Sequence, residues 1–316
     1  MLKIIGLFAV GAAGCLAAPQ AWAQAADEAN SSQGRPASSE AAGPPEVRGG
    51  PPPGVLNGPN VFDGDWITLG LGVSASPSYS GSDDYVVFPV PLIRGRIAGI
   101  GINPSAAGLT LDFVPKPQNE RPGQRSVSFS AGPTFRFRSD RSDRIRDEVV
   151  IAAGELENAV ELGASAGVTI PGVLSPIDSI SFSTDIRFDV AGAHEGMLIE
   201  PGVTYFTPMG QSAAISLSAG LSFVDDDFAD YYYSVDPAQS AASGLPEFTA
   251  DGGLNSVGVN ALFAFDFDGN VLNGGIGAFM ITGYSRLIGD AADTPFTSIR
   301  GNPDQIFGAI GLAYTF

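Results

Sequence analysis

The chain has 316 residues, of which 44% are hydrophobic and only 16% are charged, against about 25% charged in an average soluble domain. Lysine and arginine number 16 and aspartate and glutamate 34, which gives a net charge of −18. This charge excludes a nucleic-acid partner, because binding a phosphate backbone needs a basic face. A single cysteine and a single histidine exclude an internal disulfide and a Cys/His zinc cluster.

Residues 1–23 have the features of a cleaved signal peptide. Lys3 supplies the early positive charge, residues 4–18 are apolar, and Ala21-Trp22-Ala23 matches a small-x-small cleavage site. The apolar run has about 15 residues, fewer than the roughly 20 that a membrane-spanning helix needs. We therefore expect an exported protein whose mature form lacks Cys15.

Residues 24–62 have a different composition from the rest of the chain. They are rich in Ala, Ser, Gly and Pro, as in Gly50-Pro51-Pro52-Pro53-Gly54, and contain few aliphatic residues. Ordering such a segment costs more conformational entropy than its burial returns. We expect a disordered periplasmic arm, partly in polyproline II conformation, with a docking peptide as the functional alternative.

From residue 63 to the C-terminus, apolar and polar residues alternate. Between residues 160 and 170, for example, Val160, Leu162 and Ile170 alternate with Glu161 and Gly163. These runs are about 10–14 residues long, whereas globular strands average about 5–6 and tilted membrane strands need about 9–11. One face carries Phe, Ile, Val, Leu and Ala and the other Gly, Ser, Thr and scattered charge, which is typical of an outer-membrane barrel. No segment after the leader shows a clear helical period, so a membrane-spanning body is expected to be a closed barrel.

The expected fold is therefore all-β: an antiparallel transmembrane β-barrel over residues 63–316. We expect twelve strands, and ten is the alternative count because Pro89 and Pro91 interrupt ladder bonding. A soluble β-sandwich is the competing fold, which the strand length and low charge disfavour. The expected strands are 65–75, 85–95, 96–103, 107–113, 125–138, 157–170, 177–190, 197–207, 212–224, 254–267, 271–284 and 305–316.

The connectors between these strands alternate in length. Those at 138–157, 225–253 and 285–304 are long, whereas those at 171–176 and 207–211 are short. Outer-membrane barrels have long extracellular loops and short periplasmic turns. This pattern and the even strand count place both termini in the periplasm.

Eight charged residues fall on the polar face of the expected strands. The simplest interpretation is a salt-bridge network that fills a narrow barrel, because unpaired buried charge is costly. The alternative is a charged constriction that selects solutes. These lumen-facing candidates are Arg136, Arg138, Glu161, Asp185, Arg187, Asp189, Glu200 and Asp266.

Other polar motifs do not amount to an active site. His194 beside Glu195 could act as a base, but no serine motif marks a nucleophile. Asp225-Asp226-Asp227 on an expected outer loop is most simply solvated, with divalent-cation binding as the alternative. Residues 268–270 are expected to form a tight hairpin turn. We predict no catalytic, cofactor-binding or metal-binding residues and no enzymatic activity.

The C-terminus carries the sharpest local motif. Ile310, Leu312, Tyr314 and Phe316 alternate with small or polar residues and end on a terminal aromatic. This pattern resembles the β-signal that the outer-membrane assembly machinery captures, a recognition by strand addition at an exposed edge. We therefore expect these four residues to direct assembly.

Three motifs resemble those of the MipA/OmpV family of outer-membrane proteins, over roughly residues 64–316. They are 77–82 (PSYSGS), 232–235 (YYSV) and 284–295 (YSRLIGDAADTP), of which the last is the most specific. The resemblance implies a barrel in the cell outer membrane with no catalytic residue set. It also implies a scaffold that links the outer membrane to a murein lytic transglycosylase and a peptidoglycan synthase. Further expected partners are outer-membrane lipid and the barrel-assembly machinery, and the alternative function is a small-solute channel.

Overall fold

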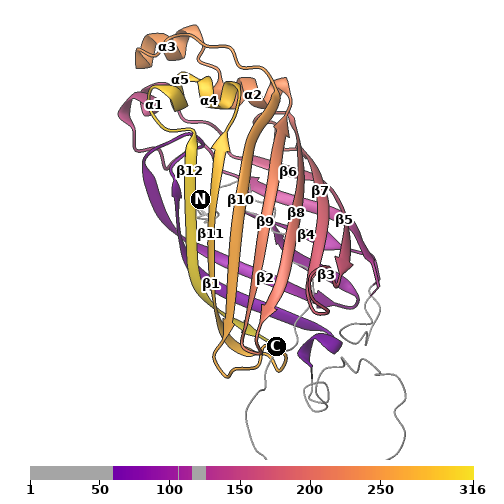
Figure 1. The fold of residues 1–316 in the computed structure, drawn as a ribbon. Coiled ribbons are helices and arrows are strands. Elements are labelled where there is room, and N and C mark those ends of the chain that lie inside the picture. Colours follow the sequence, from indigo (N-terminus) through magenta and orange to yellow (C-terminus); the bar gives the residue numbers. More distant parts are fainter. Residues whose placement is uncertain (1–59, 106, 116–125) are drawn as a thin grey trace, which may run out of the picture.

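The structure, a computed structural model, describes residues 60–105, 107–115 and 126–316. Within these residues, twelve antiparallel strands form one closed barrel in which sequence neighbours pair and β12 pairs with β1 (Figure 1). The predicted fold class and twelve-strand count are confirmed, and the ten-strand alternative is wrong. The strands are β1 (Trp66–Pro77), β2 (Tyr85–Ile97), β3 (Ile100–Ser105), β4 (Gly108–Asp112), β5 (Ser128–Arg138), β6 (Ala159–Pro171), β7 (Ser179–Asp189), β8 (Met197–Met209), β9 (Ala213–Val224), β10 (Gly253–Asp266), β11 (Gly275–Leu287) and β12 (Asp304–Thr315).

The predicted leader, 1–23, and most of the predicted arm, 24–62, lie outside the described residues. The first described element is a short 3-10 helix, η1 (Val61–Asp63), which Asn60 caps by accepting a hydrogen bond from the backbone N–H of Phe62. The backbone N–H of Val61 also donates to the carbonyl of Leu272 in the β10–β11 turn, at 2.7 Å. The chain therefore enters the barrel along one of its short turns.

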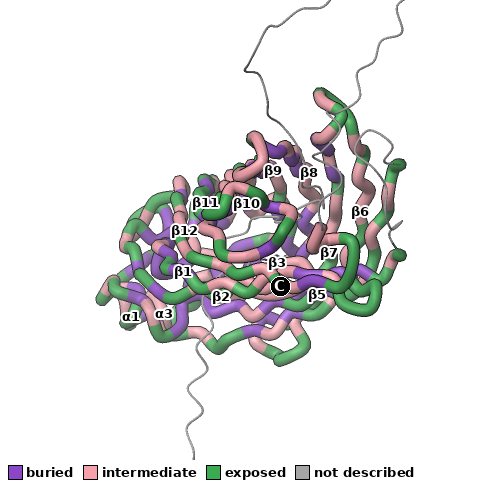
Figure 2. Tube along the Cα trace, turned by 90° about the horizontal axis from the view of Figure 1, so that it is seen from below, coloured by how far each residue is buried: buried purple, intermediate pink, exposed green. Residues whose placement is uncertain are grey.

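Along most of the long strands, residues of a more exposed face alternate with residues of a more buried face, and Figure 2 colours the chain by this burial. On β1, Leu71 and Val73 are more than half exposed, whereas Ser74 and Ser76 are buried. Because a closed barrel has one inner and one outer face, the exposed apolar positions form its outer surface. A bilayer would cover this surface, which explains why so many large apolar side chains face outward.

Tyrosines occur toward both ends of the outer face. Toward one end, the Tyr284 hydroxyl donates to Asp304 at 2.5 Å, and the Tyr85 hydroxyl accepts from the backbone N–H of Ile306. Toward the other end, the Tyr205 hydroxyl donates to Asp178 and Tyr314 packs near Phe316. Aromatic rings with a polar tip favour the membrane–water interface, so these tyrosines mark the two borders of the apolar band.

The loops at one end of the barrel fold into a cap that carries five short helices (Figure 1). They pack around two apolar clusters, one with Phe228 and Tyr232 and one with Tyr79 and Phe296. Among the described residues, no helix is long and apolar enough to cross a membrane. The helices are α1 (Glu148–Ala152), α2 (Asp226–Tyr233), α3 (Pro237–Ser243), α4 (Asp290–Asp293) and α5 (Pro295–Ser298).

The opposite end has turns, and one of them differs from its prediction. The tight hairpin expected at 268–270 is wrong: β10 ends at Asp266 and β11 begins only at Gly275. The Asp266 carboxylate accepts hydrogen bonds from three successive backbone N–H groups, those of residues 268, 269 and 270. This carboxylate holds the chain in a wider turn. By the loop-length rule for outer-membrane barrels, this end faces the periplasm and the cap faces outward.

The barrel wall is uneven at the β3–β4 hairpin. β1 and β2 share twelve register pairs, from Trp66↔Arg96 to Pro77↔Tyr85. β2 and β3 share only three, from Gly95↔Ile102 to Ile97↔Ile100, and β4 and β5 also share only three. The predicted strands 96–103 and 107–113 are thus present. The β3–β4 hairpin stops short of the cap-side end of β2, whereas on its other side it reaches Arg136 and Phe137 of β5.

Candidate functional site

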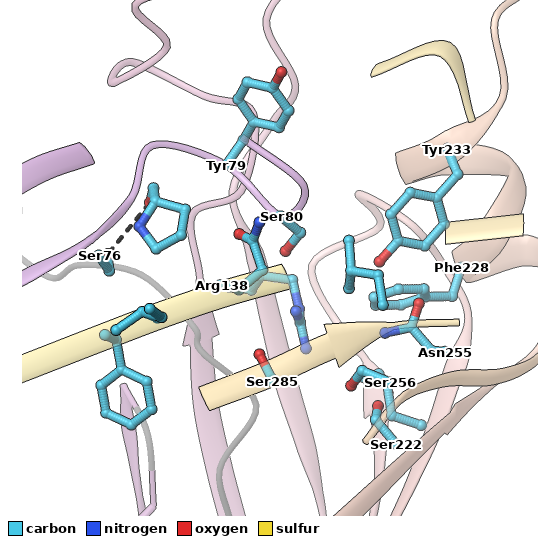
Figure 3. Close-up of a pocket in the computed structure, with 16 residues that line it drawn as sticks. Ser76, Tyr79, Ser80, Arg138, Ser222, Phe228, Tyr233, Asn255, Ser256 and Ser285 are labelled. Atoms are coloured by element: carbon cyan, nitrogen blue, oxygen red, sulfur yellow. Dashed lines mark hydrogen bonds between the residues drawn. The ribbon is translucent and has the colours of Figure 1, made fainter. Parts of the chain in front are cut away.

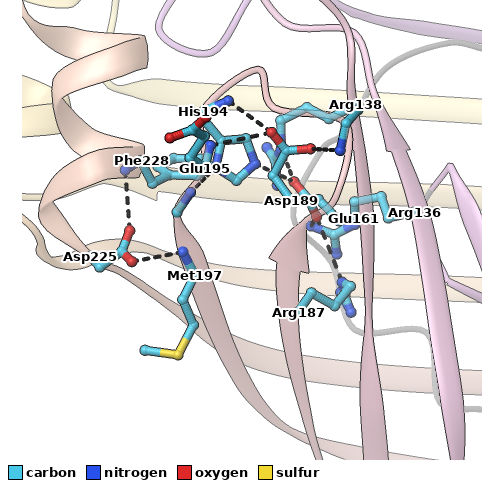
Figure 4. Close-up of polar contacts among 12 residues, drawn as sticks. Arg136, Arg138, Glu161, Arg187, Asp189, His194, Glu195, Met197, Asp225 and Phe228 are labelled. Atoms are coloured by element: carbon cyan, nitrogen blue, oxygen red, sulfur yellow. Dashed lines mark hydrogen bonds and ion pairs between the residues drawn. The ribbon is translucent and has the colours of Figure 1, made fainter.

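Six of the eight predicted lumen-facing residues meet inside the barrel. Figure 4 labels four of them, Arg136, Arg138, Glu161 and Arg187, together with Phe228 of the cap. They come from four consecutive strands, and the ladder register brings their backbones together: Arg136 lies opposite Glu161, and Asp185 opposite Glu200. Their side chains are on the buried face of each strand. The six residues, hereafter the charge network, are Arg136, Arg138, Glu161, Asp185, Arg187 and Glu200.

Glu200 on β8 lies between two arginines. The Arg136 guanidinium donates from Nη1 and Nη2 to both Glu200 carboxylate oxygens, at 3.1 and 2.7 Å. Arg187 Nη2 donates to the same carboxylate, and Arg187 Nη1 donates to Asp185 at 2.8 Å. Two-pronged arginine–carboxylate contacts of this kind fix both distance and plane, so Glu200 ties β5, β7 and β8 to one another.

Glu161 on β6 is the second anionic centre and is fully buried. Its Oε1 accepts from Arg138 Nε at 2.5 Å, and its Oε2 lies 3.9 Å from Arg136 and 3.8 Å from Arg187. The network therefore holds three guanidinium groups against three carboxylates. Removing one partner from such a buried set leaves an uncompensated charge. The resulting loss of stability is far larger than the net stabilisation that the intact pairs provide.

The remaining two predicted residues lie outside the charge network. Asp189 accepts hydrogen bonds from the backbone N–H groups of Ala191, His194 and Glu195, so it organises the β7–β8 loop. Asp266 organises the β10–β11 turn at the other end of the barrel. Both are loop-shaping carboxylates, a role that strand alternation alone does not distinguish from lumen lining.

His194 also joins the network, a contact that strand alternation does not predict. Its Nε2 lies 3.6 Å from Glu161 Oε1, while its Nδ1 accepts from the backbone N–H of Gly196 at 3.0 Å. The ring also packs against Phe228 and Tyr232 of α2. His194 thus bridges the wall and the cap, and the link depends on a loop conformation that residue spacing does not reveal.

A cation–π contact makes a second link between network and cap. The Arg138 guanidinium lies 5.0 Å from the centre of the Phe228 ring and 5.8 Å from that of Tyr232. Such contacts stabilise by about 0.5–2 kcal/mol depending on desolvation. The charged wall and the apolar cap are therefore packed as one unit.

The β5–β6 loop connects the cap helices α2 and α5 with the β1–β2 loop. The buried Arg141 donates to the carbonyl of Tyr232 at 2.9 Å and lies 3.6 Å from the centre of the Phe296 ring. Burial lowers the pKa of Arg141 to about 10, so it remains a cation at neutral pH. Asp140 in the same loop accepts from the Ser80 backbone N–H at 2.8 Å and from its hydroxyl at 2.5 Å.

A small cavity lies beneath the cap (Figure 3). Its volume is about 40 Å³, and its wall includes Arg138, Phe228, Asn255 and a group of serines. One buried water occupies roughly 10–15 Å³ on this measure, so the cavity has room for a few waters and no larger solute. Asn255 Oδ1 has no hydrogen-bond partner among the described residues, which fits a hydration site.

The acidic cluster expected on an outer loop has a structural role. Asp225 caps α2 by accepting from the backbone N–H of Phe228, and it also accepts from that of Met197. Asp226 accepts from the backbone N–H of Gly252. Within the described residues, no group of three or more His, Cys, Asp or Glu side chains is arranged to hold a metal ion.

Three of the predicted assembly residues lie on the outer face of β12, and Phe316 follows directly after it. Ile310, Leu312, Tyr314 and Phe316 are each about half exposed or more, and the Tyr314 and Phe316 rings are 4.6 Å apart. β12 pairs with β1 in the register Leu71↔Leu312 and so closes the barrel. Their role in assembly stays a prediction.

The sequence comparison assigns the family. A family model described as "MltA-interacting protein MipA" matches residues 69–316, which span the barrel from β1 to the C-terminus. The chain belongs to the MipA family. Membership and the closed barrel with its apolar outer face together place the protein in the outer membrane. A search of curated proteins found no match to the chain.

Several solved outer-membrane proteins are similar to this MipA-family chain. An outer-membrane channel from Pseudomonas putida F1 is 13% identical, with coverage of 80% of this chain and 96% of that chain and a TM-score of 0.40. The outer-membrane channel DcaP of Acinetobacter baumannii is 9% identical, with 80% and 98% coverage and a TM-score of 0.30. OprD from Pseudomonas aeruginosa is 10% identical, with 82% and 95% coverage and a TM-score of 0.25.

Proposed function

We propose that this protein is a non-catalytic scaffold in the outer membrane that holds peptidoglycan-remodelling enzymes at the periplasmic face. The observation that carries the proposal is the structure of the barrel interior below the cap. The charge network pairs its own three guanidinium groups and three carboxylates, and the cap packs onto it through His194 and Arg138. Ion pairs across four strands, together with these cap contacts, favour a stable membrane anchor over a wide solute path.

The family description names the class of partner. Members are described as interacting with MltA, and we extend this to a murein lytic transglycosylase, with a peptidoglycan synthase as the second client. The described periplasmic turns offer little surface, since a stable interface buries about 800 Å² per partner. The predicted arm, 24–62, for which a docking peptide is the functional alternative, lies almost entirely outside the described residues. The same holds for most of 114–124, which we add as a second candidate docking segment.

Among the described residues, the β6–β7 turn is the strongest additional contact. Leu174 at its tip is 79% exposed. The Asp178 carboxylate accepts from the backbone N–H groups of Val173, Leu174 and Ser175 and from the Tyr205 hydroxyl, so the turn is rigid. A preorganised apolar tip can bind without paying a large ordering cost.

The test uses the full protein in lipid nanodiscs with a purified murein lytic transglycosylase. We expect capture of the enzyme, with photo-crosslinks in 24–60, 114–124 or the β6–β7 turn. Leu174→Ser should weaken capture several-fold, whereas Leu217→Ser on the lipid-facing side of β9 serves as the matched control and should not. Planar-bilayer conductance is measured in parallel. A porin-like conductance together with no capture would replace the scaffold by the alternative, a small-solute channel.

A further inference from the structure

Three turns at the end of the barrel opposite the cap, together with η1, are joined by hydrogen bonds into one continuous surface. The Tyr205 hydroxyl on β8 donates to Asp178 of the β6–β7 turn at 2.8 Å. The backbone N–H of Val271 in the β10–β11 turn donates to the carbonyl of Gln211 in the β8–β9 turn at 3.0 Å, and η1 is bonded to the same β10–β11 turn. This surface, hereafter the periplasmic platform, consists of residues 61–65, 171–178, 209–212 and 267–274.

The β6–β7 and β8–β9 turns carry the apolar part of the platform. Leu174 and Met209 are more than half exposed, and Val173 is nearly so. The last register pair between β7 and β8 at this end is Ser179↔Phe206. β8 continues three residues beyond it, to Met209, and so runs alongside the β6–β7 turn. Two neighbouring turns therefore present three exposed apolar side chains at one rim of the barrel.

The exposed charged side chains of the platform are all negative. Asp63 and Asp65 lie in and next to η1, and Asp268 lies in the β10–β11 turn. Lysine and arginine are absent from all four segments of the platform. Opposite charges face one another across specific interfaces, and apolar side chains fill their centre. The complementary surface is therefore an apolar pocket that basic side chains border.

A buried carboxylate fixes the backbone in both of the longer turns. Asp178 accepts hydrogen bonds from the backbone N–H groups of residues 173–175. Asp266 accepts hydrogen bonds from those of residues 268–270. Both carboxylates are buried. The exposed tips thus rest on a fixed backbone, and binding a partner to them costs little conformational entropy.

The charge of the platform disfavours two other occupants. Anionic lipid head groups attract basic segments rather than acidic ones, so the inner leaflet is a poor partner for this surface. The preceding part of the chain, residues 24–59, contains four acidic and two basic residues and few aliphatic ones. It supplies neither the positive charge nor the apolar surface that the platform lacks. A separate protein with a basic face fits both requirements.

We propose that the periplasmic platform is the docking surface for the enzyme partner, and that it binds a protein face on which lysine or arginine side chains border an apolar pocket. Leu174 and Met209 enter the pocket, and Asp63 and Asp268 pair with its basic border. Each turn alone is too small for a stable interface, and the hydrogen bonds between the turns let them bind as one surface. This inference rests on the proposed scaffold function and names the chemistry of the partner's face.

The test is binding of a purified murein lytic transglycosylase to the full protein in phosphatidylcholine nanodiscs. Affinity should fall about tenfold between 50 and 500 mM salt, because salt screens the charges at the rim of the interface. Asp63→Lys combined with Asp268→Lys should lower the affinity about tenfold at the low salt concentration and much less at the high one. The matched control, Glu155→Lys combined with Glu247→Lys, makes the same change in net charge on the exposed cap and should leave the affinity unchanged.

Barrel folding of each variant is verified by heat-modifiable electrophoretic mobility. A photo-crosslinking amino acid in place of Met209 keeps the test decisive if the double variant does not fold. Its crosslinks to the enzyme should fall on peptides that contain lysine or arginine beside apolar residues. Crosslinks to lipid or to residues 24–59 in place of the enzyme would overturn the proposal.

The outcomes also separate this proposal from the scaffold function on which it rests. Capture that depends neither on salt nor on Asp63 and Asp268 would overturn the platform as the docking surface and leave the scaffold function standing. Absence of capture by the wild-type protein at both salt concentrations would overturn both.

Discussion

Strands β5 to β8 and strand β2 enclose the same interior but line it with different chemistry. The first set, joined by ladders of ten or more register pairs from Ser128 to Val224, carries the charge network. β2, whose ladder to β3 has three pairs, carries Val86, Phe88, Val90 and Leu92 on its inner face. Ion pairs require partners fixed to within a fraction of an ångström, whereas apolar contacts are non-directional. The long ladders of β5 to β8 provide that geometry, and on β2 an ion pair, Arg96 with Asp112 at 3.6 Å, lies only where that strand pairs with β3.

The largest predicted loss of stability comes from removing one charge from the charge network. Glu200→Gln leaves Arg136 and Arg187 without their shared carboxylate and should destabilise the barrel by about 3–5 kcal/mol. Urea unfolding in lipid vesicles measures the loss. Asp185→Asn is the control: this carboxylate is 15% exposed, and its one ion pair among the described residues is with Arg187, so the loss should be smaller. Equal losses would mean that the network does not act as a buried unit.

The next prediction compares the outer and inner faces of strands β5 to β8, with β6 as the example. Ala164 and Ser165 are adjacent near the middle of β6, with Ala164 on the exposed outer face and Ser165 on the inner face opposite Asp185. Ala164→Arg should cost about 2–4 kcal/mol, because it places a charge in the lipid. Ser165→Arg should cost less, since Asp185 can pair with it. The same unfolding assay compares them, and a larger cost for Ser165→Arg would mean that the assigned faces are reversed.

Much of this wall could be predicted from the sequence. Period-two alternation identified the twelve strands and their faces because inner and outer environments differ sharply, and six of the eight predicted charges came together because ladder register fixes their neighbours. The cap could not be predicted. Its helices have four to eight residues, too few for a helical period to appear, and they are stabilised by capping at Asp225 and Asp236 and by packing between distant loops.

Hydrogen exchange compares the β3–β4 hairpin with the fully paired strands without any mutation. The β3–β4 hairpin has few ladder partners, so its local opening needs less free energy than that of a strand paired along its full length. Each backbone hydrogen bond that a strand lacks lowers its free energy of local opening by about 1 kcal/mol. The amides of Ile102 and Leu111 should therefore exchange at least about tenfold faster than those of Leu217 and Val259 on β9 and β10. Uniform protection around the barrel would contradict the uneven wall.

The smallest predicted effect concerns the cap, at the start of helix α1. Asp147 caps α1 and accepts hydrogen bonds from Arg300 at 2.7 and 3.0 Å. Burial alone would raise the pKa of Asp147, but the hydrogen bonds from Arg300 and from the backbone N–H groups of Val150 and Val149 outweigh it and lower that pKa.

A folded-state pKa below the unfolded value of about 3.9 means that the stabilisation is fully present above that pH. It is lost as the pH falls further, through the folded-state pKa. Limited proteolysis with pepsin should therefore cut the β5–β6 loop a few-fold faster at pH 2 than at pH 5, after correction for the activity of the protease. Asp147→Asn keeps a capping oxygen but no charge, so its corrected cleavage rate should be high at pH 5 already and change little on acidification. If the variant retained the wild-type pH response, another carboxylate would control the opening of the cap.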